Sequence, residues 1–318
     1  MLNFLLTRAA HAGVVLCIVV VLAFAGVHLI PGDAILAAIG SSGNASDLTG
    51  VEAVRKAYRM DGPVLMQFWR WLTHFLRGDW GQSIGNGQPV LAMFMQRLPV
   101  TLELFAGATF WTLIVGIPVG MLSALRQGSL LDRVLSTLAM IGISVPSFWA
   151  GIVMIYIFAV YFQLLPPSGY TPFAEDPWLN LQSMLMPTLI LGIHSAGLLA
   201  RYVRSSLLDN MRQDFIRTAR AKGLSERQVV LRHAVKPSMI PVITVVGLSW
   251  AGLLAGAFFV EVIFALPGLG RMSVDAIFEK DFPVIQATLV AVSLNVLVVN
   301  FLVDVVYALL DPRIRLGA

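Results

Sequence analysis

The side chains that could carry chemistry within the apolar stretches of this sequence are few and isolated. Three acidic residues, Glu103, Glu261 and Asp304, interrupt such stretches, and His194 stands alone in another. An ionised carboxylate at the centre of a bilayer costs about 2.5–3.5 kcal/mol on insertion scales, so each one requires an explanation. Metal sites need several ligands at close spacing, and active sites need an acid, a base or a nucleophile together. The scattered positions favour a non-enzymatic role with no cofactor and no metal.

Glu103 and Glu261 lie at different depths of their apolar runs. Glu103 falls within the first turn after Pro99, where a helix N-terminus and lipid headgroups stabilise a negative charge, so a structural role is favoured. Glu261 is deeper and precedes a Pro267-Gly268 turn. Its carboxylate could hold an outer re-entrant turn or line a translocation path, and both interpretations stay open.

The last apolar run carries polar residues on one side. Asn300, Asp304 and Tyr307 share one helical face. Contact with a partner helix is the more economical interpretation, because a lipid-facing Asp304 would be costly. Pro146 interrupts an earlier run, and such breaks supply bends that gating could use. The candidate residues for translocation and gating are Glu261, Pro267, Gly268, Pro146, Asn300 and Asp304.

The composition excludes an ordinary soluble domain. Apolar residues make up 57% of the 318 positions, charged residues only 13%, and the mean hydropathy is +0.79. Soluble proteins carry roughly 25% charged residues, so the solvent that suits this surface is lipid. The single cysteine, Cys17, excludes an intrachain disulfide and a cysteine-based metal site.

Six apolar runs are long enough to cross a membrane, which takes about 20 residues. The first run exceeds the apolar region of about 7–15 residues found in signal peptides, so an uncleaved first helix is expected. The predicted fold class is an all-α polytopic membrane protein with six transmembrane helices. The six runs are 9–31, 99–124, 134–164, 186–204, 238–265 and 285–310.

Positive charges orient these helices. With the N-terminus inside, cytoplasmic segments hold fourteen of the 22 Lys and Arg residues, and both termini are cytoplasmic. The fourth run is the least apolar, since Pro187, Gly192, His194 and Ser195 dilute it. It is retained because without it the basic segment 201–236 would lie on the wrong side of the membrane.

The first outer segment, 32–98, is the longest non-membrane stretch on its side. It predicts one helix near 50–60 and a second, amphipathic helix rich in aromatic residues. An interfacial helix at the headgroup level is favoured for the second, because tryptophan prefers that environment. A platform for a soluble partner outside is the alternative. The aromatic and apolar positions are Phe68, Trp69, Trp71, Leu72, Phe75 and Leu76.

The segment 205–236 predicts two short helices joined by a glycine turn. The turn falls at Gly223, and Ser225 with Gln228 has the form of a capping box for a helix that continues toward Pro237, where the next span begins. An element of this kind can transmit force into the spans on either side. An apolar stripe at spacings of three and four marks the first helix: Leu208, Met211, Phe215 and Ala219.

The basic segment has two other interpretations. It carries eight Arg or Lys residues from Arg204 to Lys236 in a helix–turn–helix pattern, which could indicate a nucleic-acid reader. A position between two membrane spans disfavours that function, because DNA would have to bend up to the bilayer. A basic loop that sets topology and binds anionic membrane lipid is the remaining alternative.

At these residues the sequence resembles a known family, the permeases of binding-protein-dependent ABC importers. Residues 217–226 (RTARAKGLSE), followed by His233-Ala234 and Ile240-Pro241, resemble the cytoplasmic signature of that family. The branch that transports peptides, nickel and glutathione is the most similar. The resemblance covers nearly the whole chain in the right order. Its further motifs lie at 28–33, 142–146, 261–264, 267–271 and 304–313.

The resemblance implies a type I ABC importer permease fold, with a coupling helix that sits in a groove of an ATPase subunit. Gly223 suits the sharp turn, since glycine accepts backbone angles that other residues resist. Lys236-Pro237 departs from the basic residue and Asn of many relatives. The implied coupling residues are Thr218, Ala219, Ala221, Lys222, Gly223, Leu224, Ser225 and Glu226.

The resemblance also implies the partners: ATP-binding cassette ATPase subunits, a second homologous permease in a heterodimer, and an extracytoplasmic substrate-binding protein. The chain lacks the Gly-x-x-x-x-Gly-Lys-Ser/Thr phosphate loop, so ATP hydrolysis is expected in a partner. Peptides are the expected substrate, with glutathione or nickel as alternatives and an ion-gradient-driven carrier as a less favoured class. The expected division is 1–98, a first helix with its outer loop, and 99–318, the five-helix permease core.

Overall fold

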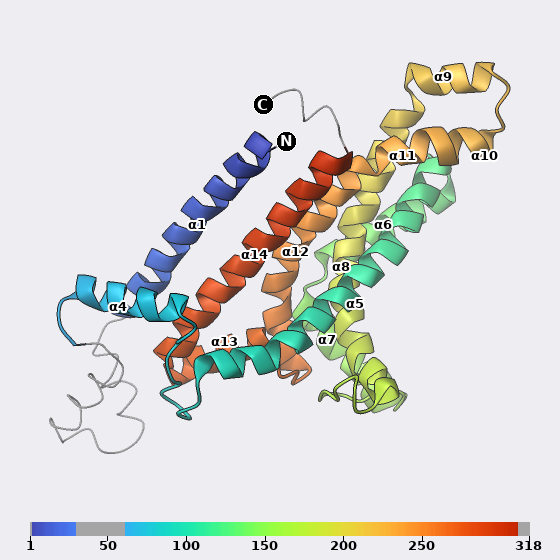
Figure 1. The fold of residues 1–318 in the computed structure, drawn as a ribbon. Coiled ribbons are helices and arrows are strands. Elements are labelled where there is room, and N and C mark those ends of the chain that lie inside the picture. Colours follow the sequence, from blue (N-terminus) through green and yellow to red (C-terminus); the bar gives the residue numbers. More distant parts are fainter. Residues whose placement is uncertain (1, 30–60, 311–318) are drawn as a thin grey trace. The chain divides into compact units, whose positions relative to one another are not determined.

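The computed structural model describes residues 2–29 and 61–310, and these ranges are almost entirely helical (Figure 1). The helix predicted near 50–60 lies outside them. The elements, in chain order, are α1 (Leu2–Leu29), α4 (Val64–Leu76), α5 (Val90–Leu125), α6 (Leu130–Ser144), α7 (Ser147–Met154), the π-helix η2 (Ile155–Tyr161), α8 (Pro177–Met211), α9 (Asp214–Ala221), α10 (Glu226–Gln228), the π-helix η3 (Val229–Ala234), α11 (Val235–Ser238), α12 (Ile240–Ile263), α13 (Leu269–Glu279) and α14 (Phe282–Leu310).

Length and composition confirm a polytopic helical membrane protein. Within residues 2–29 and 61–310, four helices are long and apolar enough to cross a membrane, and the count is five if the bent pair of α6 with α7 and η2 forms one span. The predicted run 238–265 coincides with α12, which is 24 residues long. The exact number of six therefore stays a prediction. The four unbroken candidates are Thr7–Gly26, Val90–Leu125, Pro177–Met211 and Phe282–Leu302.

The run 134–164 is not one continuous helix. α6 ends at Ser144, α7 begins at Ser147, and their axes differ by 100°. Val145 has ψ 123° and Pro146 has ψ 133°, so both residues are extended. A proline ring disfavours the helical conformation of the residue before it, which explains why the helix ends here and does not merely bend.

The contacts divide the chain into two compact units. One comprises Met1–Arg8, Leu102–Leu266 and Val299–Ala318, and the other comprises Ala9–Thr101 and Pro267–Val298. The first unit holds the connections between α5, α6, α8 and α12 and is called the core unit below. The second holds most of α1, α4, the start of α5 and α13.

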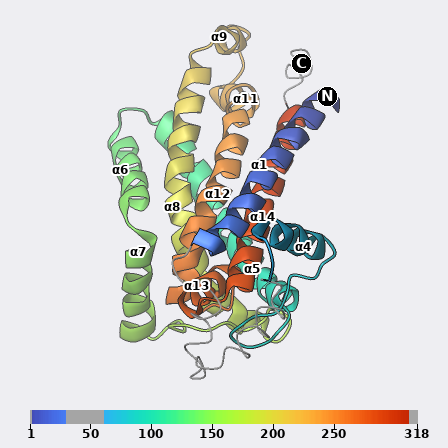
Figure 2. The same ribbon diagram turned by 90° about the vertical axis from the view of Figure 1, so that its left-hand side faces the viewer.

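In the core unit, α8 is the central helix, in contact with α6, α7, α11 and α12 (Figure 2). It runs from Pro177 to Met211, well beyond the predicted 186–204, and 72% of its apolar window is buried. Asp176 caps its start by accepting hydrogen bonds from the N–H groups of Trp178 and Leu179 at 3.0 Å. Pro187, Gly192 and Ser195, which dilute this run, are buried against protein, whereas His194 is exposed.

Glycines allow the backbone of α8 to approach the backbones of α5 and α6 closely. A Cβ atom at Gly197 would lie 2.5 Å from the carbonyl oxygen of Ala139 in α6. A Cβ atom at Gly120 in α5 would lie 2.5 Å from the carbonyl oxygen of Ala200 in α8. Small residues at such crossings let membrane helices approach closely and pack by van der Waals contact, which is the main attraction between helices in lipid.

In the second unit, a glycine-rich loop is held by one carboxylate. Asp281, which is 2% exposed, accepts hydrogen bonds from the Ser83 hydroxyl and from the Gly85 N–H at 3.3 Å. Its other oxygen accepts from the Val284 N–H at 3.4 Å, at the start of α14. Gly87 adopts φ +69°, which favours glycine. Here the glycines shape a folded loop.

The α5–α8 crossing yields the first prediction. Gly120→Ala is expected to lower the thermal unfolding temperature of the purified protein in detergent by several degrees, since its new methyl group meets backbone atoms and such overpacking costs about 1–3 kcal/mol. Gly13→Ala in α1 is the matched control, because a Cβ atom there meets nothing within 4 Å. Equal unfolding temperatures for the two variants would contradict close packing at Gly120.

Candidate functional site

The segment that joins α8 to α12, residues 212–239, is called the connector. It contains α9, a turn at Gly223 with φ +77°, and the short helices α10, η3 and α11. Figure 1 shows α9 lying alongside α10 and α11 at the end of α8. This is the predicted arrangement of two helices around a glycine turn. No atom lies within 4 Å of a Cβ at Gly223, so glycine is needed there for its backbone angle and not for space.

The predicted apolar stripe is wrong at Phe215, which is 45% exposed. The stripe assumed one continuous helix, but α8 ends at Met211 and α9 starts at Asp214. This break rotates the next helix, so Ile216, with 0% exposure, takes the inward position together with Ala219. A hydrophobic core joins these two residues to the ends of α5 and α8: Ala124, Leu207, Ile216, Ala219, Val229 and Ala234.

Of the eight residues predicted to couple to an ATPase, only Ala219 is buried. Its side chain packs in the hydrophobic core that holds α9 against the ends of α5 and α8. The remaining residues form a continuous exposed ridge from the end of α9 through the turn to the start of α10. They are Thr218, Ala221, Lys222, Gly223, Leu224, Ser225 and Glu226.

The turn is braced by polar contacts across it. Arg220 donates two hydrogen bonds to Glu226, from Nη2 to Oε1 at 2.6 Å and from Nε to Oε2 at 3.1 Å. The hydrogen bond from Arg220 lowers the pKa of the Glu226 carboxyl, so the carboxylate is charged at neutral pH. Ser225 and Gln228 form the predicted capping box, in which the Ser225 N–H donates to Gln228 Oε1 at 3.3 Å. Since these groups are exposed, they shape the turn more than they stabilise the protein.

The end of the connector differs from the prediction that a helix would stop at Pro237. Pro237 lies inside α11, and the π-helix η3 precedes it. Proline lacks an N–H donor, so it cannot form the usual helical bond to the carbonyl four residues back. Ser238 ties this region to α8, since Asn210 Nδ2 donates to Ser238 Oγ at 3.1 Å and Ser206 Oγ to the Ser238 carbonyl at 3.2 Å.

A buried carboxylate connects α5, α6 and α8 through hydrogen bonds. Asp132, which is 4% exposed, accepts from Arg204 at 2.8 Å (Nε to Oδ1) and 2.9 Å (Nη2 to Oδ2). The Ser123 hydroxyl, the Ser136 hydroxyl and the Gly128 N–H, the last at 2.9 Å, also donate to it. Five donors around one carboxylate offset the cost of its burial. This group is called the Asp132–Arg204 node.

Sequence reasoning missed this node, although Arg204 is the first of the eight basic residues that it counted up to Lys236. One local signal was available. Ser129 caps α6 and accepts from the Asp132 N–H at 3.2 Å, a pattern of Ser followed three residues later by an acidic residue. The pairing itself spans 72 residues, and no local pattern predicts it.

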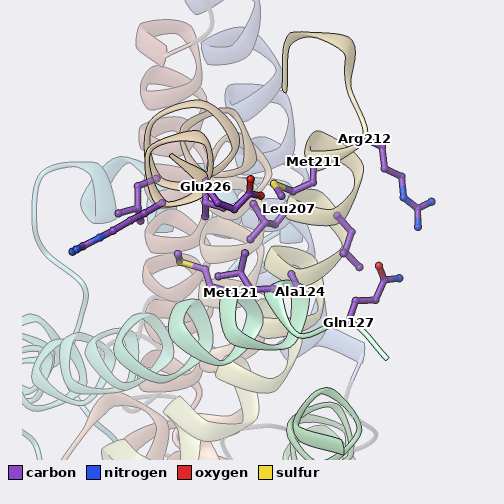
Figure 3. Close-up of a pocket in the computed structure, with 12 residues that line it drawn as sticks. Met121, Ala124, Gln127, Leu207, Met211, Arg212 and Glu226 are labelled. Carbon is purple, nitrogen blue, oxygen red and sulfur yellow. The ribbon is translucent and has the colours of Figure 1, made fainter. Parts of the chain in front are cut away.

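An open apolar cavity of about 710 Å³ lies between the connector and the ends of α5 and α8 (Figure 3). Figure 3 shows Arg212 pointing away from it and Glu226 above Met121 and Ala124. The lining residues are Met121, Ala124, Leu125, Gln127, Leu207, Leu208, Met211, Arg212, Glu226, Arg227, Val230 and Leu231.

The candidate residues for translocation and gating lie on separate elements. Glu261 in α12 is fully buried, and its carbonyl accepts from the Leu266 N–H at 2.8 Å. Asn300 in α14 is exposed, and the side chain of Asp304 lies outside the described part of the chain. Exposed Pro146 and buried Gly268 precede the first residues of α7 and α13, and Pro267 is exposed.

Glu103 has a polar partner, as a structural role requires. The Tyr170 hydroxyl donates to Glu103 Oε2 at 2.8 Å. Burial, and then the neighbouring carboxylate, raise the pKa of Tyr170 to about 12, so it is a hydrogen-bond donor at neutral pH. The Gly169 N–H donates to the Phe264 carbonyl at 2.9 Å, which fixes the same loop beside the end of α12.

Comparison with known proteins identifies the family. A family model described as "Binding-protein-dependent transport system inner membrane component" matches residues 116–316, and the model of its N-terminal region matches residues 1–105. The chain belongs to this family of permeases. The permease is thus a multi-pass membrane component of an ABC import system, as its sequence indicated.

Two relatives illustrate the similarity. A glutathione transport system permease protein of Salmonella paratyphi A and a putative peptide transport system permease protein of Brucella abortus are each 40% identical over 315 residues. Each alignment covers 99% of both chains. A solved structure, the inward-facing MetNI methionine ABC transporter, has a chain that matches with a TM-score of 0.57 and 19% identity. That match covers 69% of the permease and 96% of the other chain and confirms the predicted fold.

The Asp132–Arg204 node yields the second prediction. Asp132→Asn and Arg204→Gln are each expected to lower the unfolding temperature in detergent, because the first leaves a partly buried guanidinium without its carboxylate and the second leaves a buried carboxylate without its opposite charge. The double variant should be less destabilised than the sum of the two, with an interaction energy of about 0.5–3 kcal/mol. Arg201→Gln, an exposed position on the same helix, is the control and should stay within about 0.5 kcal/mol of the unmodified protein. Additive effects in this cycle would show that the pair does not couple.

Proposed function

We propose that the permease forms one membrane-spanning half of an ATP-driven peptide importer and that its connector receives the movement of an ATPase subunit. The main support for this proposal is that the connector has one buried side and one exposed side. Ile216 and Ala219 fix it from within, while residues 220–228 are exposed. An exposed ridge on an anchored base is suited to transmit a push from a docked partner.

The route of this force follows the anchors. Ser206 and Asn210 of α8 bond to Ser238, so α8 and the start of α12 move with the connector. Two residues before Ser206 in the same helix, Arg204 bonds to Asp132 of α6. Movement of the exposed ridge is therefore shared by three helices. We take this shared movement as the step that shifts the spans between two arrangements, each favoured by a different ligand state.

The direction of transport places the connector in the cytoplasm. The positive-inside distribution supports this side, with both chain termini on it. ATP hydrolysis takes place in separate subunits, because the chain has no phosphate-loop motif. An extracytoplasmic binding protein delivers substrate on the other side, and a second, homologous permease completes the path.

Peptides are the proposed substrates, and glutathione, itself a small peptide, is the alternative. Relatives of equal identity are named for each. Reconstitution with the ATPase and the substrate-binding protein, followed by uptake of labelled dipeptide, glutathione or Ni²⁺, separates the alternatives. Uptake that persists without ATP but requires an ion gradient would overturn the importer mechanism.

For the path itself, we propose roles for the six candidates found in the sequence. Pro146 supplies a bend, since it stands where α6 and α7 diverge by 100°. Glu261 is proposed to affect the path through contacts inside the protein and not through contact with lipid, because its side chain is fully buried. Pro267, Gly268, Asn300 and Asp304 are proposed to act in gating. The division at residues 98 and 99 is proposed to separate the first helix and its loop from the five-helix core.

The exposed ridge yields the third prediction. Ala221→Asp in the assembled transporter is expected to reduce substrate uptake at least about tenfold while ATP hydrolysis continues, because a charged group desolvated in a protein groove costs several kcal/mol. Gln213→Asp, which places the same charge at the exposed start of α9, is the matched control and should preserve uptake. Normal uptake by the Ala221→Asp transporter would contradict the coupling role.

A further inference from the structure

Helix α4 (Val64–Leu76) presents three different faces. One face packs on aromatic residues of its own unit. Phe68 and Trp71 lie 5.3 and 5.8 Å, between ring centroids, from Phe24 of α1, and Phe75 stacks on Trp80 at 4.8 Å. These contacts fix the helix against the chain.

A second face of α4 is polar. Arg70 Nη1 donates to Asp61 Oδ1 at 3.0 Å, and Gln67 Nε2 donates to the Gly62 carbonyl at 2.9 Å. His74, one turn beyond Arg70, shares this side. The polar groups follow one stripe along the helix; Arg70 and Gln67 bond to the loop that precedes it, and the His74 ring bonds to the Arg70 carbonyl.

The third face is apolar and open. Leu65, Trp69 and Leu76 are 71%, 57% and 76% exposed. At about 100° per residue they fall within about 40° of one another and point roughly opposite to Arg70 and His74. A soluble protein surface seldom leaves three such side chains aligned along one stripe of a helix.

The position of α4 on α1 identifies the medium around this stripe. The candidate span in α1 runs from Thr7 to Gly26 with only 11% of its window buried, and it exposes Val14, Ile18 and Leu22. Phe24, which α4 contacts, lies two residues before the end of that span. Figure 1 shows α4 lying across this end of α1. The helix is therefore placed at the depth where a spanning helix leaves the hydrocarbon.

We propose that α4 lies in the plane of the membrane surface with Leu65, Trp69 and Leu76 inserted at the boundary between phospholipid headgroups and acyl chains. An apolar stripe opposite a polar stripe is the pattern of helices that bind this boundary. Trp69 fits there because its ring is apolar and its N–H is polar, and tryptophan is enriched at that level. The stripe anchors the outer loop to the bilayer beside the first span.

A docked soluble protein is the competing occupant. A specific protein interface takes roughly 20–30 residues on each side, and this stripe offers three large side chains along a 13-residue helix. It is too narrow to hold a partner by itself, whereas lipid needs no complementary surface. The proposed membrane contact of α4 follows from the span in α1, and it does not depend on which substrate is transported.

The single cysteine makes a direct test possible. Cys17→Ala gives a cysteine-free chain, into which Leu65→Cys, Leu76→Cys or Gln67→Cys is introduced and labelled with a nitroxide. The full-length protein in phosphatidylcholine–phosphatidylglycerol nanodiscs is then probed with oxygen, which concentrates in lipid, and with a water-soluble nickel chelate. Labels at 65 and 76 should show an oxygen-to-nickel collision ratio at least about threefold above that of the Gln67 control on the polar face.

Two results would overturn the proposal. A higher collision rate with the nickel chelate at 65 and 76 than with oxygen would place the stripe in water. Full protection of both positions from oxygen and nickel upon addition of the purified substrate-binding protein, with no lipid signature before it, would assign the stripe to that partner. Gel filtration and unfolding temperature of each labelled variant confirm that it is folded, so a loss of signal cannot be mistaken for either result.

Discussion

The close approach of α8 to α5 and α6 is the constraint on which the core unit depends. Helices in lipid gain little from hiding apolar surface, so their association needs tight contact over a long crossing. Gly120 and Gly197 provide it, because at both positions backbone atoms stand where a side chain would be. The same contact brings Arg204 of α8 within reach of Asp132 in α6. A charged pair at this depth is stable only because the backbone and two hydroxyl groups complete the coordination of the carboxylate.

The proposed coupling through the connector depends on this same packing. A connector attached only by its chain ends would absorb a push by bending. Here the side chain of Ile216 in α9 is fully buried, and Ser238 forms hydrogen bonds with two side chains of α8. The segment that bears the exposed ridge is therefore attached to α8 by packing and hydrogen bonds, and α8 is attached to α6 by the Asp132–Arg204 node. The structure thus offers a physical reason why movement at a surface turn would reach the spans.

The two units use carboxylates in the same way. Asp132 gathers donors from α5, α6 and α8, and Asp281 gathers donors from the loop around Ser83 and from the start of α14. In each case a short side chain satisfies backbone groups near a helix end, where N–H groups lack partners. Glu103 follows a related pattern with Tyr170. Acidic residues at the ends of the apolar runs are therefore largely structural in this protein.

Sequence alone was sufficient for the properties that depend on local composition. The length of apolar runs predicted a helical membrane protein, Gly223 predicted a turn with a positive φ, and Ser225 with Gln228 predicted a helix cap, because each of these depends on a few neighbouring residues. The tertiary structure decided what depends on distant contacts: Phe215 faces outward because α8 stops at Met211, the run at 134–164 turns by 100° at Pro146, and Asp132 finds a partner 72 residues away. Periodicity fixes which residues share a helical face, but only the packing of other helices determines which face is buried.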